Sequence, residues 1–276
     1  MVITSYTRSQ EHIVYIIVHG TWSHHGGNWF MPGGDFFTTL QMQLPENARI
    51  VPFLWSGKNS HSARVWAAKA LVELIKSYPA STKINVIGHS HGASILFIAS
   101  QELAQTGILI HNCYALATPI KVPLYLPNSA VIKKVYHLFS LQDSVQLVFG
   151  RFKRVLPTDQ ATINLRIIVN NIEPEHFQLH SPAVAKWIGK HYLQPIDIFF
   201  TTNKHAHILM RIDDDGNCAY EIDAEREKLL QQEQTFKQYM INAVKMAKNK
   251  AQSIHNKNKK KLLNKIAQYV HSNKKL

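Results

Sequence analysis

A serine between two glycines is the arrangement in this sequence best suited to covalent chemistry. The run Gly88-His89-Ser90-His91-Gly92 has the G-x-S-x-G spacing of a turn that presents a nucleophilic serine. Glycine on both sides lets neighbouring backbone pass close by, and a strained turn projects the serine Oγ outward. With a base beside it, such a hydroxyl attacks carbonyl carbon. The alternative interpretation is an ordinary glycine-rich strand-to-helix turn.

A second motif could hold the negative charge that such an attack creates. His19-Gly20-Thr21-Trp22 follows the first apolar run of the chain. Backbone N–H groups just after a His-Gly pair can donate hydrogen bonds to an oxyanion. We expect the donor here to be the amide of Thr21, with Trp22 as second choice. The amide of His91, next to the serine, would be the other donor.

These motifs need a scaffold that brings the ends of several strands together. The sequence predicts short apolar strands alternating with helices, which indicates a mostly parallel sheet with helices on both faces. The strands are expected at Ile13–Val18, Ala48–Trp55, Lys83–Ile87, Asn112–Leu116, Val135–Ser140 and Leu165–Asn170, and the helices at 63–78, 93–103 and 182–189. Residues 22–37, rich in glycine and aromatic residues, are expected to form a loop.

Several short motifs occur in an order that resembles bacterial lipases and esterases of the α/β-hydrolase superfamily. They are HGTW (19–22), FLWSG (53–57), VIGHSHG (86–92), LATP (116–119) and FSLQDSV (139–145), and the resemblance covers about residues 10–195. It implies the α/β-hydrolase fold and a Ser-Asp-His triad in that chain order. It also implies hydrolysis of a carboxylic ester through an acyl-enzyme, without a cofactor.

The acid of such a triad should follow a strand that comes after the serine. Asp143 lies just past the predicted strand Val135–Ser140, where the resemblance places the triad acid. Its task would be to fix the histidine tautomer and stabilise the imidazolium. Asp159 and Asp197 are the alternatives, and a solvated loop aspartate is the non-catalytic interpretation.

The base should lie in the loop after the strand Leu165–Asn170. His176 and His180 both lie there. The resemblance places His176 at the catalytic position. His180 would stand at the start of the closing helix, beside a cap formed by Ser181 and Pro182. The sequence therefore favours His176 and keeps His180 as the alternative base.

Two loops could shape a substrate pocket. Residues 120–131 are apolar and broken by proline, which suits a lid or acyl-pocket wall as well as a packed loop. Residues 146–162 carry Arg151, Lys153 and Arg154. They are expected to form a solvated basic loop, with a pocket rim that favours an anionic head group as the alternative.

Charge divides the chain into two parts. The chain of 276 residues has a net charge of +13, yet residues 237–276 hold eleven of its 31 Lys and Arg residues and no acidic residue, so residues 1–236 have 20 basic against 18 acidic groups. We expect a catalytic domain at 1–195 and an extension at 196–276, made of a hairpin (197–222) and Lys-rich helices (223–276). The basic segment could dock on a protein surface or bind an anionic membrane, whereas no nucleic-acid motif accompanies it.

Other features narrow the function classes. The His pairs at 24/25, 89/91 and 205/207 lack the Cys, Asp or Glu partners of a zinc site, so no metal is expected. No signal peptide or membrane span is apparent, which predicts a cytoplasmic protein, with peripheral membrane association as an option. The expected function is a serine esterase or lipase acting on a small-molecule or lipid ester. The alternatives are an acyltransferase with the same triad and a non-catalytic binding protein on a hydrolase scaffold.

Overall fold

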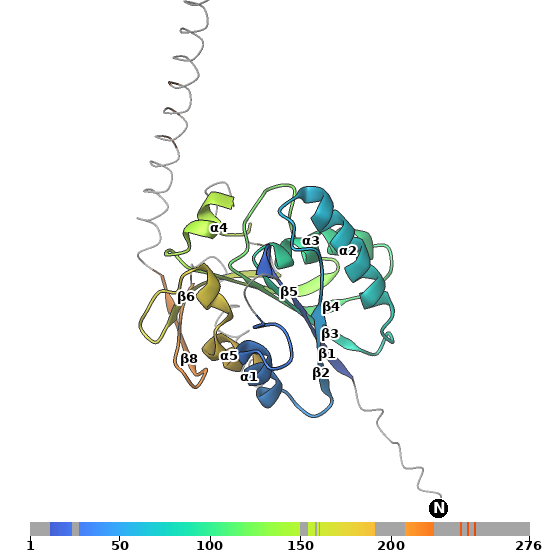
Figure 1. Cartoon of the computed structure of the whole chain (residues 1–276), viewed down its shortest axis with the longest axis horizontal. Coiled ribbons are helices and arrows are strands. Elements are labelled where there is room, and N and C mark those ends of the chain that lie inside the picture. Colours follow the sequence, from blue (N-terminus) through green and yellow to red (C-terminus); the bar gives the residue numbers. More distant parts are fainter. Residues whose placement is uncertain are drawn as a thin grey trace, which may run out of the picture. The chain divides into compact units, whose positions relative to one another are not determined.

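The described strands form one sheet in the order β2-β1-β3-β4-β5-β6-β7-β8 (Figure 1). The structure is a computed structural model that describes residues 12–23, 28–149, 154–157, 159, 161–190 and 208–223, together with 238, 242 and 246. Neighbouring strands run parallel from β2 to β7, and only β8 pairs antiparallel, with β7. The carboxyl ends of the parallel strands therefore share one edge of the sheet.

Most expected elements are present, with shifted ends. The strands are β1 (Ile13–Val18), β2 (Ala48–Phe53), β3 (Lys83–His89), β4 (Ile110–Leu116), β5 (Ile132–Phe139), β6 (Thr162–Val169), β7 (Ile208–Ile212) and β8 (Cys218–Ile222). The helices are α1 (Asp35–Gln43), α2 (His61–Lys76), α3 (His91–Leu103), α4 (Ser144–Phe149) and α5 (Pro182–Lys190), with a 3-10 helix, η2 (His176–His180).

Helices cover both faces of the sheet, and successive residues of β1 show why. Val14, Ile16 and Val18 pack in a core with residues of α2 and α3. Tyr15 and Ile17 pack on the opposite face, in a core with residues of α1 and α5. Side chains of a strand alternate between faces, so a continuously apolar strand is suited to burial between two helical layers. The predicted fold class is confirmed: the chain has the α/β-hydrolase fold.

Two expectations need correction. Residues 22–37 are not loop throughout, because α1 begins at Asp35 and buries Phe36, Phe37 and Leu40. The hairpin expected at 197–222 forms from β7 and β8, and β7 extends the same sheet by pairing with β6. The proposed boundary at 195 thus falls between two strands of one sheet, and the contacts divide the chain after Ala224 instead.

The second unit, residues 225–276, contains few described positions. Gln238, Asn242 and Met246 are helical, and Gln238 donates a hydrogen bond to the side chain of Asn242 (3.2 Å). Residues 197–207 of the expected hairpin and almost all of the Lys-rich segment lie outside the described residues. Within the described part of the chain, no helix has the length and apolar character needed to cross a bilayer.

Candidate active site

Ser90 occupies the turn between β3 and α3 in a strained backbone conformation. Its φ of 53° and ψ of −126° are values that residues with a side chain rarely adopt. The turn is held from the neighbouring strand, because the Ser90 N–H donates to the Leu116 carbonyl at the end of β4 (2.7 Å). The turn places Ser90 at the carboxyl edge of the sheet, between β3 and α3.

The two glycines of the motif make the close approach of strand and helix possible. A Cβ added to Gly92 would overlap the carbonyl oxygen of Val18, at the end of β1. A Cβ added to Gly88 would overlap the backbone of Ala93, in the first turn of α3. Any side chain at either position would push α3 off the sheet and displace the turn.

A carboxylate and an imidazole meet beside this turn. Asp143 follows β5 and is fully buried, and His176, the first residue of η2, follows β6. The Nδ1–H of His176 donates to Oδ2 of Asp143 (2.8 Å), while the other carboxylate oxygen accepts from the N–H of Gln146 (2.7 Å). The aspartate therefore fixes the tautomer that leaves Nε2 of His176 able to accept a proton.

His176 lies close to His89, the residue before Ser90. Its ring lies 4.8 Å from the ring of His89, whose Nε2–H donates to the His176 carbonyl (3.1 Å). Burial, followed by the charges of His180 and His176, lowers the pKa of His89 well below its ordinary value. The fold therefore favours the neutral form of His89, which is buried beside His176.

The other acid and base candidates lie elsewhere. His180 stacks on Trp29, with ring centroids 4.4 Å apart, whereas the hydrogen bond to Asp143 comes from His176. Burial lowers the pKa of His180 to about 4. Asp159 accepts hydrogen bonds from the N–H groups of Ala161 and Thr162 and so caps the start of β6. Asp197 lies outside the described residues.

The turn after β1 lies against the serine. A Cβ added to Gly20 would come within 3.0 Å of the Ser90 Cβ. The Trp22 N–H donates a hydrogen bond to the Gly57 carbonyl (3.0 Å), whereas no described residue accepts a hydrogen bond from the Thr21 N–H. The Thr21 hydroxyl lies 2.8 Å from Nδ1 of His91, which ties this turn to the start of α3. Of the two expected donors in the turn, Thr21 is the one with an available amide.

Sequence reasoning missed the residues that hold Asp143 in place. The buried Arg154 donates to the carbonyls of Ser140 and Asp143 (2.6 and 2.9 Å), so it braces the loop that carries Asp143 and is not solvated as expected. Arg151 and Lys153 lie outside the described residues.

A buried ion cluster braces the same loop from the other side. Arg166 pairs with both Glu173 (2.9 Å) and Asp223 (3.1 Å). Glu173 in turn accepts from the Leu141 N–H (2.6 Å), two residues before Asp143. Glu173 lies 32 positions from Leu141, and Asp223 lies 57 positions from Arg166, so no local sequence pattern indicates these two contacts.

Described His, Cys, Asp and Glu residues form no group of three that could hold a metal ion. His24, His25, His205 and His207 lie outside the described residues.

Comparisons with known proteins return structural likeness at low identity. A cutinase-like protein from a Cryptococcus species is 14% identical, with a TM-score of 0.39 over 70% of this chain and 94% of that one. A lidless α/β serine hydrolase from Xanthomonas campestris is 16% identical, with a TM-score of 0.42 over 66% and 83%. A Trichoderma reesei cutinase is 16% identical, with a TM-score of 0.36 over 54% and 68%. No protein-family model and no curated protein matches the chain. The chemistry therefore has to be judged from the site itself.

Proposed function

We propose that this chain, which has the α/β-hydrolase fold, is a serine hydrolase that cleaves carboxylic esters with Ser90 as nucleophile, His176 as base and Asp143 as acid. The observation that carries the proposal is the hydrogen bond from His176 Nδ1 to the buried Asp143 carboxylate. The three residues follow β3, β5 and β6 in the chain order Ser, Asp, His.

In the first step, Nε2 of His176 takes the proton of Ser90 as the serine oxygen bonds to the ester carbonyl carbon. The carbonyl oxygen becomes an oxyanion, held by the amides of Thr21 and His91. The oxyanion then re-forms the carbonyl, the bond to the alcohol oxygen breaks, and His176 returns its proton to that oxygen. An alcohol leaves and an acyl-serine remains.

Water completes the cycle by the same route. His176 takes a proton from water as the oxygen bonds to the acyl carbon, and then protonates Ser90 as the acyl–serine bond breaks. The products are a carboxylic acid and the free enzyme. Asp143 stays ionised throughout and stabilises the imidazolium formed in each half.

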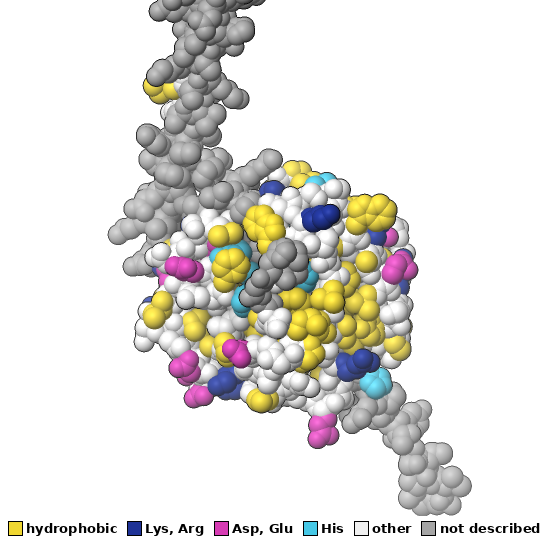
Figure 2. Space-filling view, in the orientation of Figure 1, with side chains coloured by type: hydrophobic (Ala, Val, Ile, Leu, Met, Phe, Trp, Pro, Cys, Tyr) yellow, Lys and Arg dark blue, Asp and Glu magenta, His cyan; other side chains and the backbone are white. Residues whose placement is uncertain are grey.

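The surroundings of the site suit an ester with an apolar portion. Phe177 packs edge-on against His176, with ring centroids 5.1 Å apart, and its side chain is 66% exposed. Trp22, beside Thr21, is 55% exposed. In the space-filling view, histidine side chains reach the surface between hydrophobic side chains (Figure 2). These exposed aromatic side chains would bind an apolar portion of the ester.

Matched variants test the proposal with 4-nitrophenyl butyrate as substrate. His176→Ala should lower kcat by roughly four orders of magnitude or more, because the base is lost. Asp143→Asn should cost about as much, because the histidine then takes the wrong tautomer. His180→Ala and Asp159→Asn are the controls and should retain wild-type kcat within about tenfold. A His176→Ala enzyme as active as the His180→Ala enzyme would refute the assignment.

A further inference from the structure

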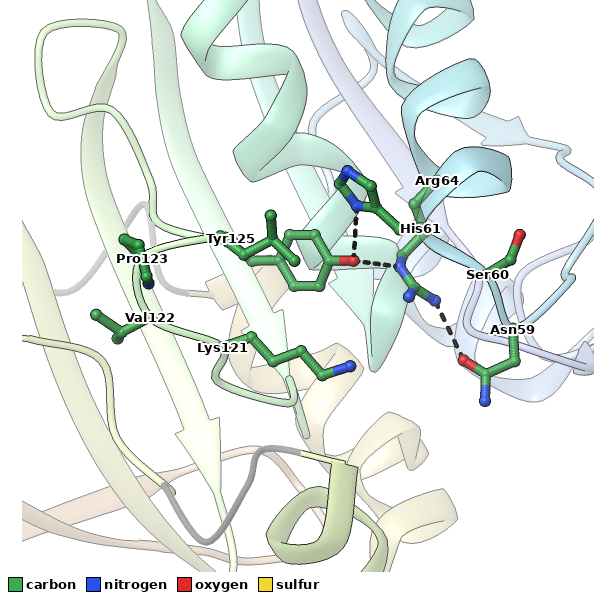
Figure 3. Close-up of a pocket in the computed structure, with 9 residues that line it drawn as sticks. Asn59, Ser60, His61, Arg64, Lys121, Val122, Pro123 and Tyr125 are labelled. Atoms are coloured by element: carbon green, nitrogen blue, oxygen red, sulfur yellow. Dashed lines mark hydrogen bonds between the residues drawn. The ribbon is translucent and has the colours of Figure 1, made fainter.

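A pocket of about 480 Å³ lies between the start of α2 and the connection from β4 to β5 (Figure 3). Its wall on the α2 side contains Arg64 and His61, and the opposite wall contains Lys121 and Tyr125. The rest of the lining is Asn59, Ser60, Val122, Pro123 and Leu124. Described acidic residues contribute nothing to this lining, so the fixed charge on the walls is positive.

Arg64 is the unusual member of the pocket. Its side chain is only 3% exposed, yet it has no ion pair with any described carboxylate. Its Nε–H donates to the Tyr125 hydroxyl (2.9 Å), and Nη1 donates to the side-chain oxygen of Asn59 (3.3 Å). Both acceptors are neutral, so they satisfy hydrogen-bonding capacity without balancing the charge. A buried, unbalanced guanidinium is costly to the fold and calls for an anion.

The neighbouring groups are arranged to keep that charge facing the pocket. The guanidinium carbon lies 5.3 Å from the centre of the Tyr125 ring, so the ring supports one side of the cation. The Tyr125 oxygen accepts from Arg64 and also contacts Nδ1 of His61 (3.1 Å). Figure 3 shows the Lys121 side chain extending from the opposite wall toward Arg64. Two cations thus converge on one space.

The pocket adjoins the site of the proposed chemistry. Lys121 follows β4, whose last residue, Leu116, accepts the hydrogen bond from the Ser90 N–H. On the other side, Gly57 lies two residues before Asn59, which lines the pocket. The Gly57 carbonyl accepts a hydrogen bond from the N–H of Trp22, and Trp22 follows the proposed oxyanion donor Thr21. Burial and then the charges of Arg64 and Lys121 lower the pKa of His91 to about 3, which places both cations within electrostatic reach of the residue after Ser90.

From these contacts we infer that the pocket binds an anionic oxygen group, a carboxylate or phosphate, carried by the ester substrate. The inference rests on the proposed ester hydrolysis and specifies its substrate class. Arg64 would donate to the anion through its remaining N–H groups, and Lys121 would approach it from the opposite wall. The substrate would then be an ester with a negative charge a short distance from the scissile carbonyl.

Matched ester pairs test this in the full-length protein. 4-Nitrophenyl hydrogen glutarate and its methyl ester differ only in whether the acyl end is charged. 4-(Butanoyloxy)benzoate and its methyl ester differ only in whether the alcohol portion is charged. In at least one pair the wild-type kcat/KM should be about tenfold or more higher for the acid. Lys121→Gln and Arg64→Gln should bring that ratio close to one.

Lys69→Gln is the matched control, because it removes the same charge from an exposed position of α2 outside the pocket. The ratio should stay at the wild-type value in this variant. If the Arg64→Gln variant does not fold, the Lys121→Gln variant still tests the inference, because Lys121 is only half-buried. An ester-cleaving enzyme with no preference in either pair, or with a preference that survives Lys121→Gln, would overturn the inference.

Calorimetric titration with inorganic phosphate separates this inference from the proposed function. Phosphate should bind the wild type and the Lys69→Gln variant alike, and more weakly by about tenfold when Lys121 or Arg64 is changed. If no ester is cleaved but this pattern appears, hydrolysis fails and the anion site stands. If esters are cleaved but phosphate binding is equal in all variants and no acid is preferred, the anion site fails alone.

Discussion

The fold favours the neutral forms of three histidines around the serine turn, the buried His89 and His91 and the half-buried His180. Burial is the main cause for His89, His91 and His180. It lowers the pKa of His91 to about 3 and that of His180 to about 4, against an ordinary value near 6.5. The unfolded chain therefore takes up protons at these residues as pH falls below about 6.5, while the folded chain does not.

The free energy of unfolding should consequently fall between about pH 6.5 and pH 4, by up to about 1.4 kcal/mol per pH unit for each such histidine. Urea denaturation at pH 7.5, 6.5, 5.5 and 4.5 measures this. His180→Phe keeps a ring to stack on Trp29 and removes one titrating group, so its slope in this window should be shallower. Equal slopes for the variant and the wild type would mean that His180 is not held neutral.

The proposed triad residues were accessible from the sequence because each lies at the end of an apolar strand. Ser90 is identified by its glycines, and Asp143 and His176 by the strands that precede them. The choice of His176 over His180 had needed a resemblance; the contact with Asp143 now gives it a physical basis. Arg154 and Arg64 were not accessible, because their partners are backbone carbonyls or residues distant in the chain.

At the scale of elements, the close packing of α3 on β1 and β3 determines the position of Ser90. Gly92→Ala should destabilise the protein by about 1–3 kcal/mol, because the new Cβ meets the Val18 backbone and the helix must move. It should also lower ester hydrolysis, since Ser90 moves with the helix. Urea denaturation and kcat/KM with 4-nitrophenyl butyrate check the two effects.

The control on the same helix is Glu102→Ala, at an exposed position, where a change within about 0.5 kcal/mol is expected. In an unobstructed helix, alanine is favoured over glycine by roughly 1 kcal/mol. A Gly92→Ala protein that is more stable than the wild type would therefore show that the close approach does not exist.

Short or glycine-rich elements were the ones that the sequence did not predict. The helix α1 follows two Gly-Gly pairs and a proline, which are typical of turns. These residues favoured a loop prediction over the helix that the apolar residues Phe36, Phe37 and Leu40 indicate. The helix α4 has six residues, too few for a hydrophobic period to emerge. The strands of the sheet were predictable because burial between two helical layers requires continuous apolar runs.

At the scale of the molecule, the proposed chemistry and most of the net charge belong to different parts of the chain. Every residue of the proposed site lies within the unit 1–224, whereas eleven lysines lie at 237–276. A chain that ends at Phe236 should keep kcat/KM for 4-nitrophenyl butyrate within about twofold of the full-length value, because a domain with its own core folds alone.

We propose that the Lys-rich segment provides attraction to anionic membranes. Full-length protein should sediment with phosphatidylserine vesicles at low salt and be released as salt rises, since surface charge attraction is screened. The truncated chain should not sediment with them. Truncated protein that still binds the vesicles would assign the attraction to another surface, and truncated protein without activity would place the segment in the enzyme's folding.

The central claim, an activated serine at position 90, is tested most directly by reaction with a fluorophosphonate probe and mapping of the modified residue by mass spectrometry. A single adduct on Ser90 is expected in the wild type and in His180→Ala. It should be absent from Ser90→Ala and strongly reduced in His176→Ala, because the probe reacts only with a serine whose proton the base can take. An adduct on another residue, or labelling of folded His176→Ala at the wild-type rate, would contradict the account.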